Sequence, residues 1–378
     1  MRVMLISGRA GDGTCGVGDY SLFLAAELAR EVEVDLLHRE GHGPRQEYLN
    51  ALQERPHLRL VALHDFGSGA VGTILRLVRQ RRPDIVHLQY PAREYRFSLM
   101  PLWLAWFRSR LCPARFVLTL HEYSAAHPLR RLAGQALIRS ADQVLLPALA
   151  EFQALKRRFP RLPLSYVPNG CFFATLAGSA GMQSGGEREP IVLYFGLPSK
   201  TKSFDRLARL LKAMREAGAQ PELKLHFVGK LPSRSPAAAF FREWISQGFI
   251  EMHPFLPLEK LRQLAESSLL LLFPFEFDTH RSSLINALAW DAPIACFGCA
   301  PGIAEEYAGM LPLALAADDD EGVPRRLGDF LNLLHADFAS AAREQLQRQR
   351  ALRERLDMSR IAQQHLSVYN QALRKKAS

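Results

Sequence analysis

Short apolar runs alternate with amphipathic helical segments along most of the chain, and this alternation begins twice. The first series opens with Arg2 to Ser7 (RVMLIS), which a glycine-rich loop and a helix follow. The second opens with Ile191 to Phe195 (IVLYF), which a lysine-rich loop and a helix follow. Strands that alternate with helices build parallel sheets with helices on both faces. The sequence therefore predicts an α/β fold with two Rossmann-like, doubly wound domains.

The domain boundaries follow from length and composition. The 378 residues exceed one ordinary core and suit two domains of roughly 150 to 200 residues each. Pro168-Asn-Gly170 closes the first series with a turn. Residues 171–190 lose periodicity and fill with Gly, Ser and Ala, which is typical of a linker and mobile loop. We expect an N-terminal domain over 1–170, a linker over 171–190, a C-terminal domain over 191–357 and a terminal helix within 358–378.

Charge and hydropathy narrow the class of protein. Hydrophobic residues make up 48% of the chain and charged residues 23%, which indicates a globular, soluble protein. No apolar stretch reaches the roughly 18 residues of a membrane-spanning helix, and the chain enters its first strand without a secretory signal, so we expect a cytoplasmic location. The net charge of +10 favours phosphorylated ligands, an anionic membrane face or nucleic acid. Because no recognised nucleic-acid motif accompanies it, we expect no nucleic-acid partner.

Tyr95 to Phe107 (YRFSLMPLWLAWF) concentrates aromatic residues beside Arg96, Arg108 and Arg110. Aromatic and basic residues together suit a membrane interface. A helix buried between a sheet and solvent would have the same composition, and both interpretations stay open.

The five cysteines are scattered and odd in number, unlike a disulfide framework. Cys296 and Cys299 form a CxxC pair, but the pair lacks two further zinc ligands and lies in an expected strand. We expect core or strand-end cysteines rather than a metal or redox pair, and no metal ligands in the site.

The stretch from Phe273 to Ile294 predicts an anion site. An apolar strand leads into a polar loop, and a helical pattern then resumes behind Arg281, Ser282 and Ser283. A helix N-terminus offers unpaired N–H groups and partial positive charge, to which Arg281 adds a full charge. The corner suits a phosphate or diphosphate, although many surface strand-to-helix corners share its composition.

Two histidines and a glycine loop mark the carboxyl ends of the first strands. Gly8 to Gly18 joins a strand to a helix, but its spacing is neither a P-loop nor a GxGxxG motif. His87 and His121 both follow expected strands. Since ligands of doubly wound folds bind beyond the carboxyl ends of strands, either histidine is a candidate ligand contact or a plain surface residue.

The order of these motifs resembles that of GT-B nucleotide-sugar glycosyltransferases, in particular the retaining glycosyltransferase family four. The resemblance covers almost the full chain. The motifs that carry it are Cys15-Gly-Val-Gly-Asp-Tyr20, Asp84-Ile-Val-His87, Val117-Leu-Thr-Leu-His121, Pro168-Asn-Gly170 and the segment from Phe195 to Lys202.

The resemblance implies an active site in the interdomain cleft and a terminal helix that packs back on the N-terminal domain. It implies a retaining enzyme of hexosyltransferase type that uses a UDP- or GDP-sugar, needs no cofactor or metal, and serves bacterial polysaccharide or glycolipid synthesis. A glycan or lipid-linked acceptor and peripheral contact with the inner membrane fit this expectation. The base, the sugar, the acceptor and the oligomeric state stay open.

The resemblance also assigns site residues in three groups. The catalytic group is His121, Lys202, Arg281 and Asp278. The donor-binding group is Gly196, Ser199, Lys200, Ser282, Ser283, Leu284 and Asn286. The acceptor-side loop is Gly16, Val17, Gly18, Asp19 and Tyr20.

The chain departs from the family pattern at three positions. Ser199 stands where the family usually has an arginine, and Lys200 is a possible substitute. Asp278 and Asn286 stand where the family usually has two glutamates. Arg281 to Leu284 resembles a subset of the family in which the glutamates are likewise replaced. The alternatives are an epimerase or phosphorylase on the same scaffold, or a catalytically silent partner subunit.

Overall fold

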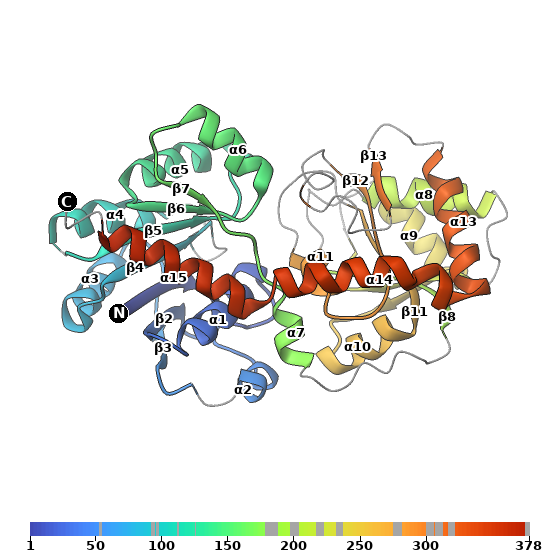
Figure 1. Cartoon of the computed structure of the whole chain (residues 1–378), viewed down its shortest axis with the longest axis horizontal. Helices are drawn as coiled ribbons and strands as arrows, with labels where there is room; N and C mark the ends of the chain where they lie inside the picture. Colours follow the sequence, from blue (N-terminus) through green and yellow to red (C-terminus); the bar gives the residue numbers. More distant parts are fainter. Residues whose placement is uncertain are drawn as a thin grey trace. The chain divides into compact units, whose positions relative to one another are not determined.

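The computed structural model divides the chain into two compact units, Met1–Leu176 with Leu356–Ser378, and Ala177–Arg355 (Figure 1). The described residues are 1–52, 55–91, 95, 98–111, 113–124, 126–177, 188–196, 204–216, 223–231, 237–274, 282–299, 306, 313–316 and 322–374.

The first unit is built on a seven-stranded sheet of order β3-β2-β1-β4-β5-β6-β7, in which every neighbouring pair is parallel. The chain order reverses between β1 and β4, which makes their carboxyl ends the place where such folds bind ligands. The strands are β1 (Arg2–Gly8), β2 (Glu33–Arg39), β3 (Leu58–Leu63), β4 (Ile85–Tyr90), β5 (Arg115–Leu120), β6 (Gln143–Leu146) and β7 (Leu164–Tyr166).

Helices cover both faces of this sheet because its strands are apolar on both sides. In β1, Val3 and Leu5 belong to one core cluster, whereas Met4 and Ile6 belong to the other. Side chains of α1 and α15 pack into the first cluster, and those of α3 and α4 into the second. The helices of this unit are α1 (Gly16–Leu28), α2 (Gln46–Leu52), α3 (Ala70–Arg81), α4 (Met100–Leu111), α5 (Pro128–Ser140), α6 (Leu149–Arg158), α7 (Phe172–Ala177) and α15 (Met358–Arg374).

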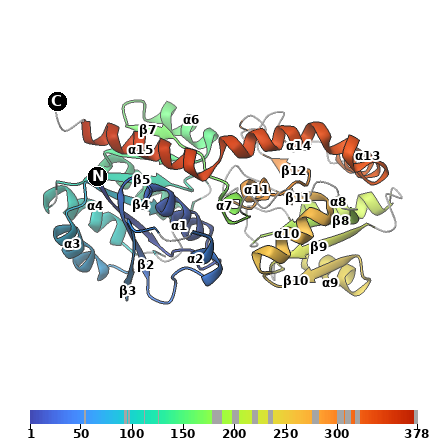
Figure 2. The ribbon, with the colours of Figure 1, turned by 60° about the horizontal axis from the view of Figure 1, so that its bottom comes forward.

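The C-terminal helix α15 packs against α1 and returns the chain to the first unit (Figures 1 and 2). Ile361 and Tyr369 are fully buried in the core that α1 shares. The turn before the linker fits this contact, because a Cβ at Gly170 would lie 2.3 Å from Met358 Sδ. Glycine at position 170 therefore lets the start of α15 approach the backbone closely.

The beginning of the expected linker is helical, which corrects the prediction that the linker starts at residue 171. Phe172 of α7 stacks on Phe23 with ring centroids 5.0 Å apart and is buried. The apolar pair Phe172 and Phe173 explains why this segment packs onto the first unit. Residues 178–187 of the expected linker lie outside the described part of the chain.

The second unit is built on a six-stranded parallel sheet of order β10-β9-β8-β11-β12-β13. Its strands are β8 (Glu189–Phe195), β9 (Lys224–Val228), β10 (Ile250–His253), β11 (Ser268–Pro274), β12 (Ile294–Cys299) and β13 (Leu313–Ala316). Its helices are α8 (Phe204–Glu216), α9 (Ala237–Ser246), α10 (Leu258–Ser267), α11 (Ser282–Ala287), α13 (Gly322–Ala336) and α14 (Phe338–Arg355). The two parallel sheets with their covering helices confirm the predicted fold class.

Buried side chains hold the elements of the second unit together. The ring of Tyr194 lies 4.6 Å from that of Phe227 and 5.6 Å from that of Phe204. From α14, Gln349 donates to the carbonyl of Ala292 and accepts from the N–H of Ile294, both at 2.9 Å. Gln349 thereby satisfies backbone groups at the start of β12.

None of the helices in the described part of the chain combines the length and apolarity that crossing a bilayer requires.

Candidate functional site

The loop between β1 and α1 lies at the carboxyl edge of the first sheet, and His121 follows β5 at the same edge. Tyr20 of α1 connects them, because its ring meets the His121 ring edge-on with centroids 5.8 Å apart. Two sequence-predicted features, the glycine loop and the histidine after the strand, therefore lie together.

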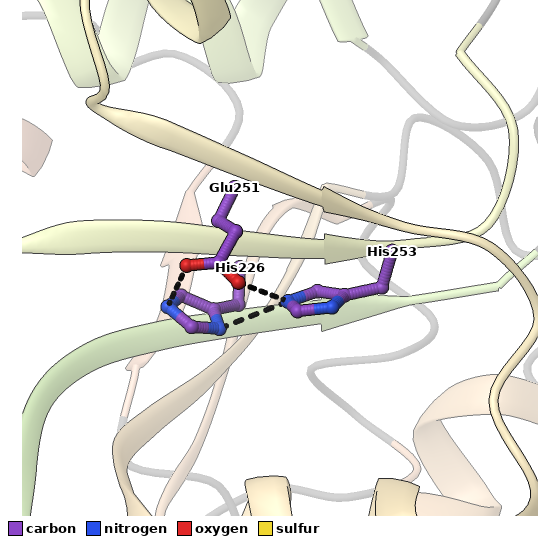
Figure 3. A group of neighbouring side chains, drawn as sticks. All are labelled: His226, Glu251 and His253. Atoms are coloured by element: carbon purple, nitrogen blue, oxygen red, sulfur yellow. Dashed lines mark hydrogen bonds and ion pairs between the residues drawn. The ribbon is translucent and has the colours of Figure 1, made fainter.

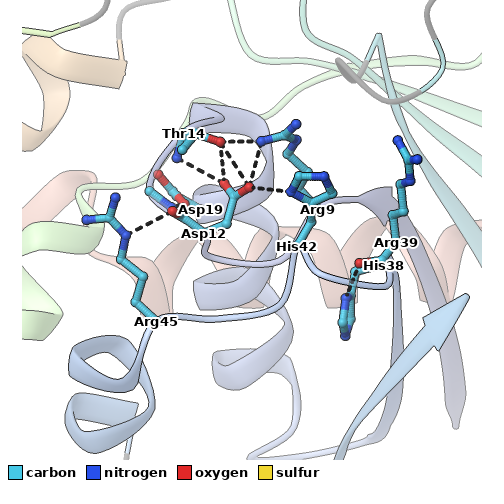
Figure 4. A network of polar contacts seen from close by, with 9 residues as sticks. Arg9, Asp12, Thr14, Asp19, His38, Arg39, His42 and Arg45 are labelled. Carbon is cyan, nitrogen blue, oxygen red and sulfur yellow. Dashed lines mark hydrogen bonds and ion pairs between the residues drawn. The ribbon is translucent and has the colours of Figure 1, made fainter. Parts of the chain in front are cut away.

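Asp12 organises the glycine loop through its carboxylate (Figure 4). The carboxylate accepts hydrogen bonds from the N–H and the hydroxyl of Thr14, both at 2.9 Å. It also lies 2.6 Å from the Arg9 guanidinium and 3.1 Å from His42 Nδ1. Arg45 directly precedes α2, and its Nε donates to the Asp12 carbonyl at 2.9 Å. These contacts fix the loop before any ligand binds.

Two glycines of the loop suit its backbone and packing: Gly13 through its positive φ, and Gly18 through its close approach to Arg9. Gly13 has a φ of 71°, and a Cβ there would lie 2.2 Å from the Arg45 guanidinium carbon. A Cβ at Gly18 would lie 2.7 Å from that of Arg9. The glycines thus accommodate two arginines that bracket the loop.

The predicted acceptor-side residues point mostly into the protein. Val17, Gly18, Asp19 and Tyr20 are buried, whereas Gly16 is half-buried. Asp19 Oδ1 accepts from the N–H of Gly13 at 3.0 Å. Burial raises the pKa of Asp19 to about 7, and that hydrogen bond opposes the shift. The Asp19 carboxyl therefore braces the loop from inside.

Gln89 of β4, which the sequence analysis did not single out, positions His121. His121 Nε2 lies 2.6 Å from Gln89 Oε1, and His121 is buried. Because an amide oxygen only accepts, this contact makes Nε2 the protonated ring nitrogen. The strand extends to Tyr90, so Gln89 lies inside it, on the same face as His87.

His87 does not reach the ligand edge, which corrects the placement of this histidine at a strand end. It lies inside β4, is fully buried, and uses both ring nitrogens within the protein. Nδ1 lies 2.7 Å from the Tyr369 hydroxyl, and Nε2 lies 2.7 Å from Thr119 Oγ1. Burial lowers the pKa of His87 well below its ordinary value. His87 is therefore a neutral core histidine.

In the second unit, Gly196 follows β8 and its N–H donates to the Val228 carbonyl at 3.0 Å. A Cβ at Gly229, whose φ is 141°, would lie 2.5 Å from the Gly196 oxygen. The backbones at the ends of β8 and β9 therefore approach each other closely, and a side chain at position 229 would not fit between them.

Helix α11 begins at Ser282, one of the two serines of the predicted anion site. Leu284 and Asn286 are buried, and Asn286 Nδ2 donates to Ser282 Oγ at 3.3 Å. Ser283 is half-buried. The remaining predicted donor and catalytic residues lie outside the described residues, namely Ser199, Lys200, Lys202, Asp278 and Arg281. Among the described residues, none of the predicted site residues belongs to a cluster of three metal-ligand side chains.

Comparisons with known proteins concern the fold of the chain and the family that its first unit resembles. Residues 15–170 match the family model of the glycosyl transferase 4-like domain, which includes the end of the glycine loop, His121 and Gly170. No curated protein matches the chain.

Solved structures of similar fold extend over both units. The sucrose-phosphate synthase of Thermosynechococcus elongatus matches with a TM-score of 0.73 and 18% identity, and each chain is covered completely. A glycosyltransferase from Rickettsia africae matches with a TM-score of 0.67 and 12% identity, over 98% of each chain. An alpha-glucosyltransferase bound to UDP and DNA matches with a TM-score of 0.66 and 14% identity, over 98% of this chain and 99% of the other. The chain therefore has the GT-B glycosyltransferase fold, and residues 15–170 of its first unit resemble the glycosyl transferase 4-like domain.

Proposed function

We propose that this chain transfers a hexosyl group from a nucleoside diphosphate sugar to an acceptor hydroxyl, with retention at the anomeric carbon. The observation that carries the proposal is the meeting of the glycine loop, Tyr20 and His121 at the carboxyl edge of the first sheet. Tyr20 and His121 both lie in the segment that matches the glycosyl transferase 4-like domain, residues 15–170. We assign the acceptor side to the first unit and the donor side to the second.

The donor side has to stabilise a leaving diphosphate. Breaking the bond between sugar and phosphate builds negative charge on the phosphate oxygens, and preorganised positive groups lower that barrier. We assign this role to Lys202 and Arg281, together with Ser282 and Ser283 at the start of α11. Asp278 would hold sugar hydroxyls, and Asn286 supports the helix start through Ser282. Because side chains supply the positive charge, we propose that no metal is required.

On the acceptor side, His121 would orient a hydroxyl of the sugar or of the acceptor. Gln89 holds Nε2 of its ring, and Tyr20 meets one ring edge. Two such contacts fix the imidazole plane, which lowers the cost of orienting a reactant. Gly16, which is half-buried, would let the acceptor approach the loop backbone.

A thermal-shift comparison of UDP, GDP, ADP, TDP and CDP tests the donor assignment. The alpha-glucosyltransferase neighbour binds UDP, and we propose a UDP- or GDP-linked donor. At a hundredfold excess over the dissociation constant, a ligand of the folded state stabilises it by about 2.7 kcal/mol. We expect one diphosphate to raise the melting temperature by several degrees, equally with and without EDTA.

The matching nucleotide sugar should then lose its sugar to a glycan or lipid-linked acceptor. Absence of a shift with all five diphosphates would contradict the proposal. An isomerised sugar formed without acceptor would identify an epimerase instead.

The face formed by α4 and α5 suggests where the acceptor comes from. Trp103 and Trp106 on α4 are 43% and 45% exposed, and Leu129 and Leu132 on α5 are 63% and 65% exposed. Arg131 is also exposed on α5. Aromatic and basic groups together suit an anionic membrane surface. We propose that the chain works in the cytoplasm at the inner membrane face, on polysaccharide or glycolipid precursors.

Replacing both Trp103 and Trp106 by serine should weaken binding to anionic phospholipid vesicles by roughly tenfold or more, since interfacial aromatic rings contribute area that partitions into the headgroup region. Cosedimentation with vesicles measures this. Leu333→Ser in α13, which removes a 60% exposed side chain from the second unit, is the matched control. Equal vesicle binding by the double variant and the control would refute the membrane contact.

A further inference from the structure

His226, Glu251 and His253 project from one face of the second sheet at its outer strand. His226 belongs to β9, and Glu251 and His253 belong to β10, which is the terminal strand of the described sheet. In the parallel register Glu251 is the partner of His226. Because side chains two apart share a face of a strand, His253 follows Glu251 onto the same face. Figure 3 shows the three side chains converging.

The ligand atoms of this cluster are close enough to share one ion. His226 Nδ1 lies 3.1 Å from His253 Nε2, and Glu251 Oε1 lies 3.6 Å from His253 Nε2. One donor atom from each side chain lies within 4.8 Å of the others. Two nitrogens at about 2.1 Å from a tetrahedral zinc ion would lie about 3.4 Å apart. The observed nitrogen separation is therefore near the value that a shared ion requires.

The Glu251 carboxylate also faces the other nitrogen of the His226 ring. The second oxygen of Glu251, Oε2, lies 3.5 Å from His226 Nε2. A proton on Nε2 would face that oxygen and leave Nδ1 as the ligand, which is the role of a carboxylate that orients a metal-bound histidine.

We propose that His226, Glu251 and His253 form a binding site for a borderline divalent cation of the Zn²⁺ class. Two imidazoles and one carboxylate are ligands that suit Zn²⁺, and three protein ligands leave a position for water. The side chain of Glu251 is 55% exposed, whereas those of His226 and His253 are 10% and 19% exposed, so that water reaches the site from the Glu251 side. The ion would hold β10 against β9. The site shares no side chain with the residues assigned to sugar transfer.

Titration of the chelator-treated full-length protein with Zn²⁺, in competition with a chromophoric chelator, tests the site. We expect a single Zn²⁺ per chain and a higher melting temperature in its presence. Loss of a partner that only orients a ligand costs roughly 10- to 100-fold in affinity. His253→Ala, which removes a ligand, should therefore weaken binding by roughly 100-fold and abolish the thermal shift.

Glu251→Gln should weaken Zn²⁺ binding by roughly tenfold or more, since the amide is a poorer ligand. His335→Ala removes an exposed imidazole from α13 of the same unit and should leave the affinity unchanged. Circular dichroism of the metal-free variants checks that they fold. Failure of the parent protein to bind one Zn²⁺ per chain in the titration would overturn the proposal. Unchanged Zn²⁺ affinity in His253→Ala would overturn it as well.

Discussion

The double substitution Lys202→Ala and Arg281→Ala is expected to lower turnover by about 10³-fold or more. Removal of one preorganised group that stabilises developing negative charge costs about 10²- to 10³-fold in turnover. Two such groups facing one diphosphate would cost more, although the effects of residues that act together do not simply multiply. Their charges matter most when the bond to the sugar is breaking.

Binding of the free diphosphate should be weakened less than turnover, because in the proposed site the backbone and the hydroxyls of Ser282 and Ser283 would still contribute. Initial rates at saturating donor and equilibrium binding of the diphosphate separate the two effects. Lys212→Ala removes an exposed charge from α8 and is the matched control. Turnover by the double variant within about threefold of the parent value would contradict the assignment of Lys202 and Arg281 to diphosphate stabilisation. A parent protein that binds the diphosphate and transfers nothing would instead indicate a silent subunit.

The architecture was predictable because strand and helix periodicity is local. The two apolar runs that open the series, Arg2 to Ser7 and Ile191 to Phe195, became β1 (Arg2–Gly8) and β8 (Glu189–Phe195). Short elements such as α2 and β13 carry too little periodicity to be recognised in this way. The segment Phe172–Ala177 was assigned to the linker by its composition, although its two phenylalanines pack into the core.

The positions of polar side chains were harder to predict, since periodicity does not identify a partner. The extent of β4 decided the role of His87, whose Tyr369 partner is 282 residues away in the sequence. Gln89 lies in the same strand and could have been recognised only once His121 was placed directly after the neighbouring strand β5. Arg45 and His42, which contact Asp12 of the glycine loop, lie outside the loop in the sequence. Their contacts with Asp12 could be recognised only from the fold of the whole unit.

Two buried histidines are expected to make the protein acid-sensitive between pH 6.5 and about 4. Burial lowers the pKa of His365 from 6.5 to about 4, and it lowers the pKa of His87 well below 6.5. In the unfolded chain both imidazoles take up protons near pH 6.5, whereas in the folded protein they stay neutral. The unfolded state therefore binds more protons, and the free energy of unfolding falls as the pH drops through this window. At about 1.4 kcal/mol per pKa unit, His365 alone contributes on the order of 3 kcal/mol.

Leucine substitutions separate the two histidines. His365 Nδ1 donates to the Ile361 carbonyl at 2.9 Å, and Nε2 is buried without a hydrogen-bond partner among the described residues. His365→Leu should therefore change stability at pH 7 by less than about 1 kcal/mol, since it loses one bond and removes one unsatisfied group. His365→Leu should also reduce the fall in the free energy of unfolding between pH 6.5 and about 4.

His87→Leu should be much more damaging at pH 7, because it leaves the Tyr369 and Thr119 hydroxyls without this partner in a fully buried site. Each orphaned buried group costs about 1 to 3 kcal/mol, so the expected loss for the two hydroxyls is about 2 to 6 kcal/mol. Urea denaturation at several pH values measures both variants, and His64→Leu, whose parent side chain is 96% exposed, is the control. Equal losses in the free energy of unfolding at pH 7 for His87→Leu and His365→Leu would contradict the hydrogen-bonded role of His87. An unchanged fall in that free energy below pH 6.5 in His365→Leu would contradict the buried neutral state of His365.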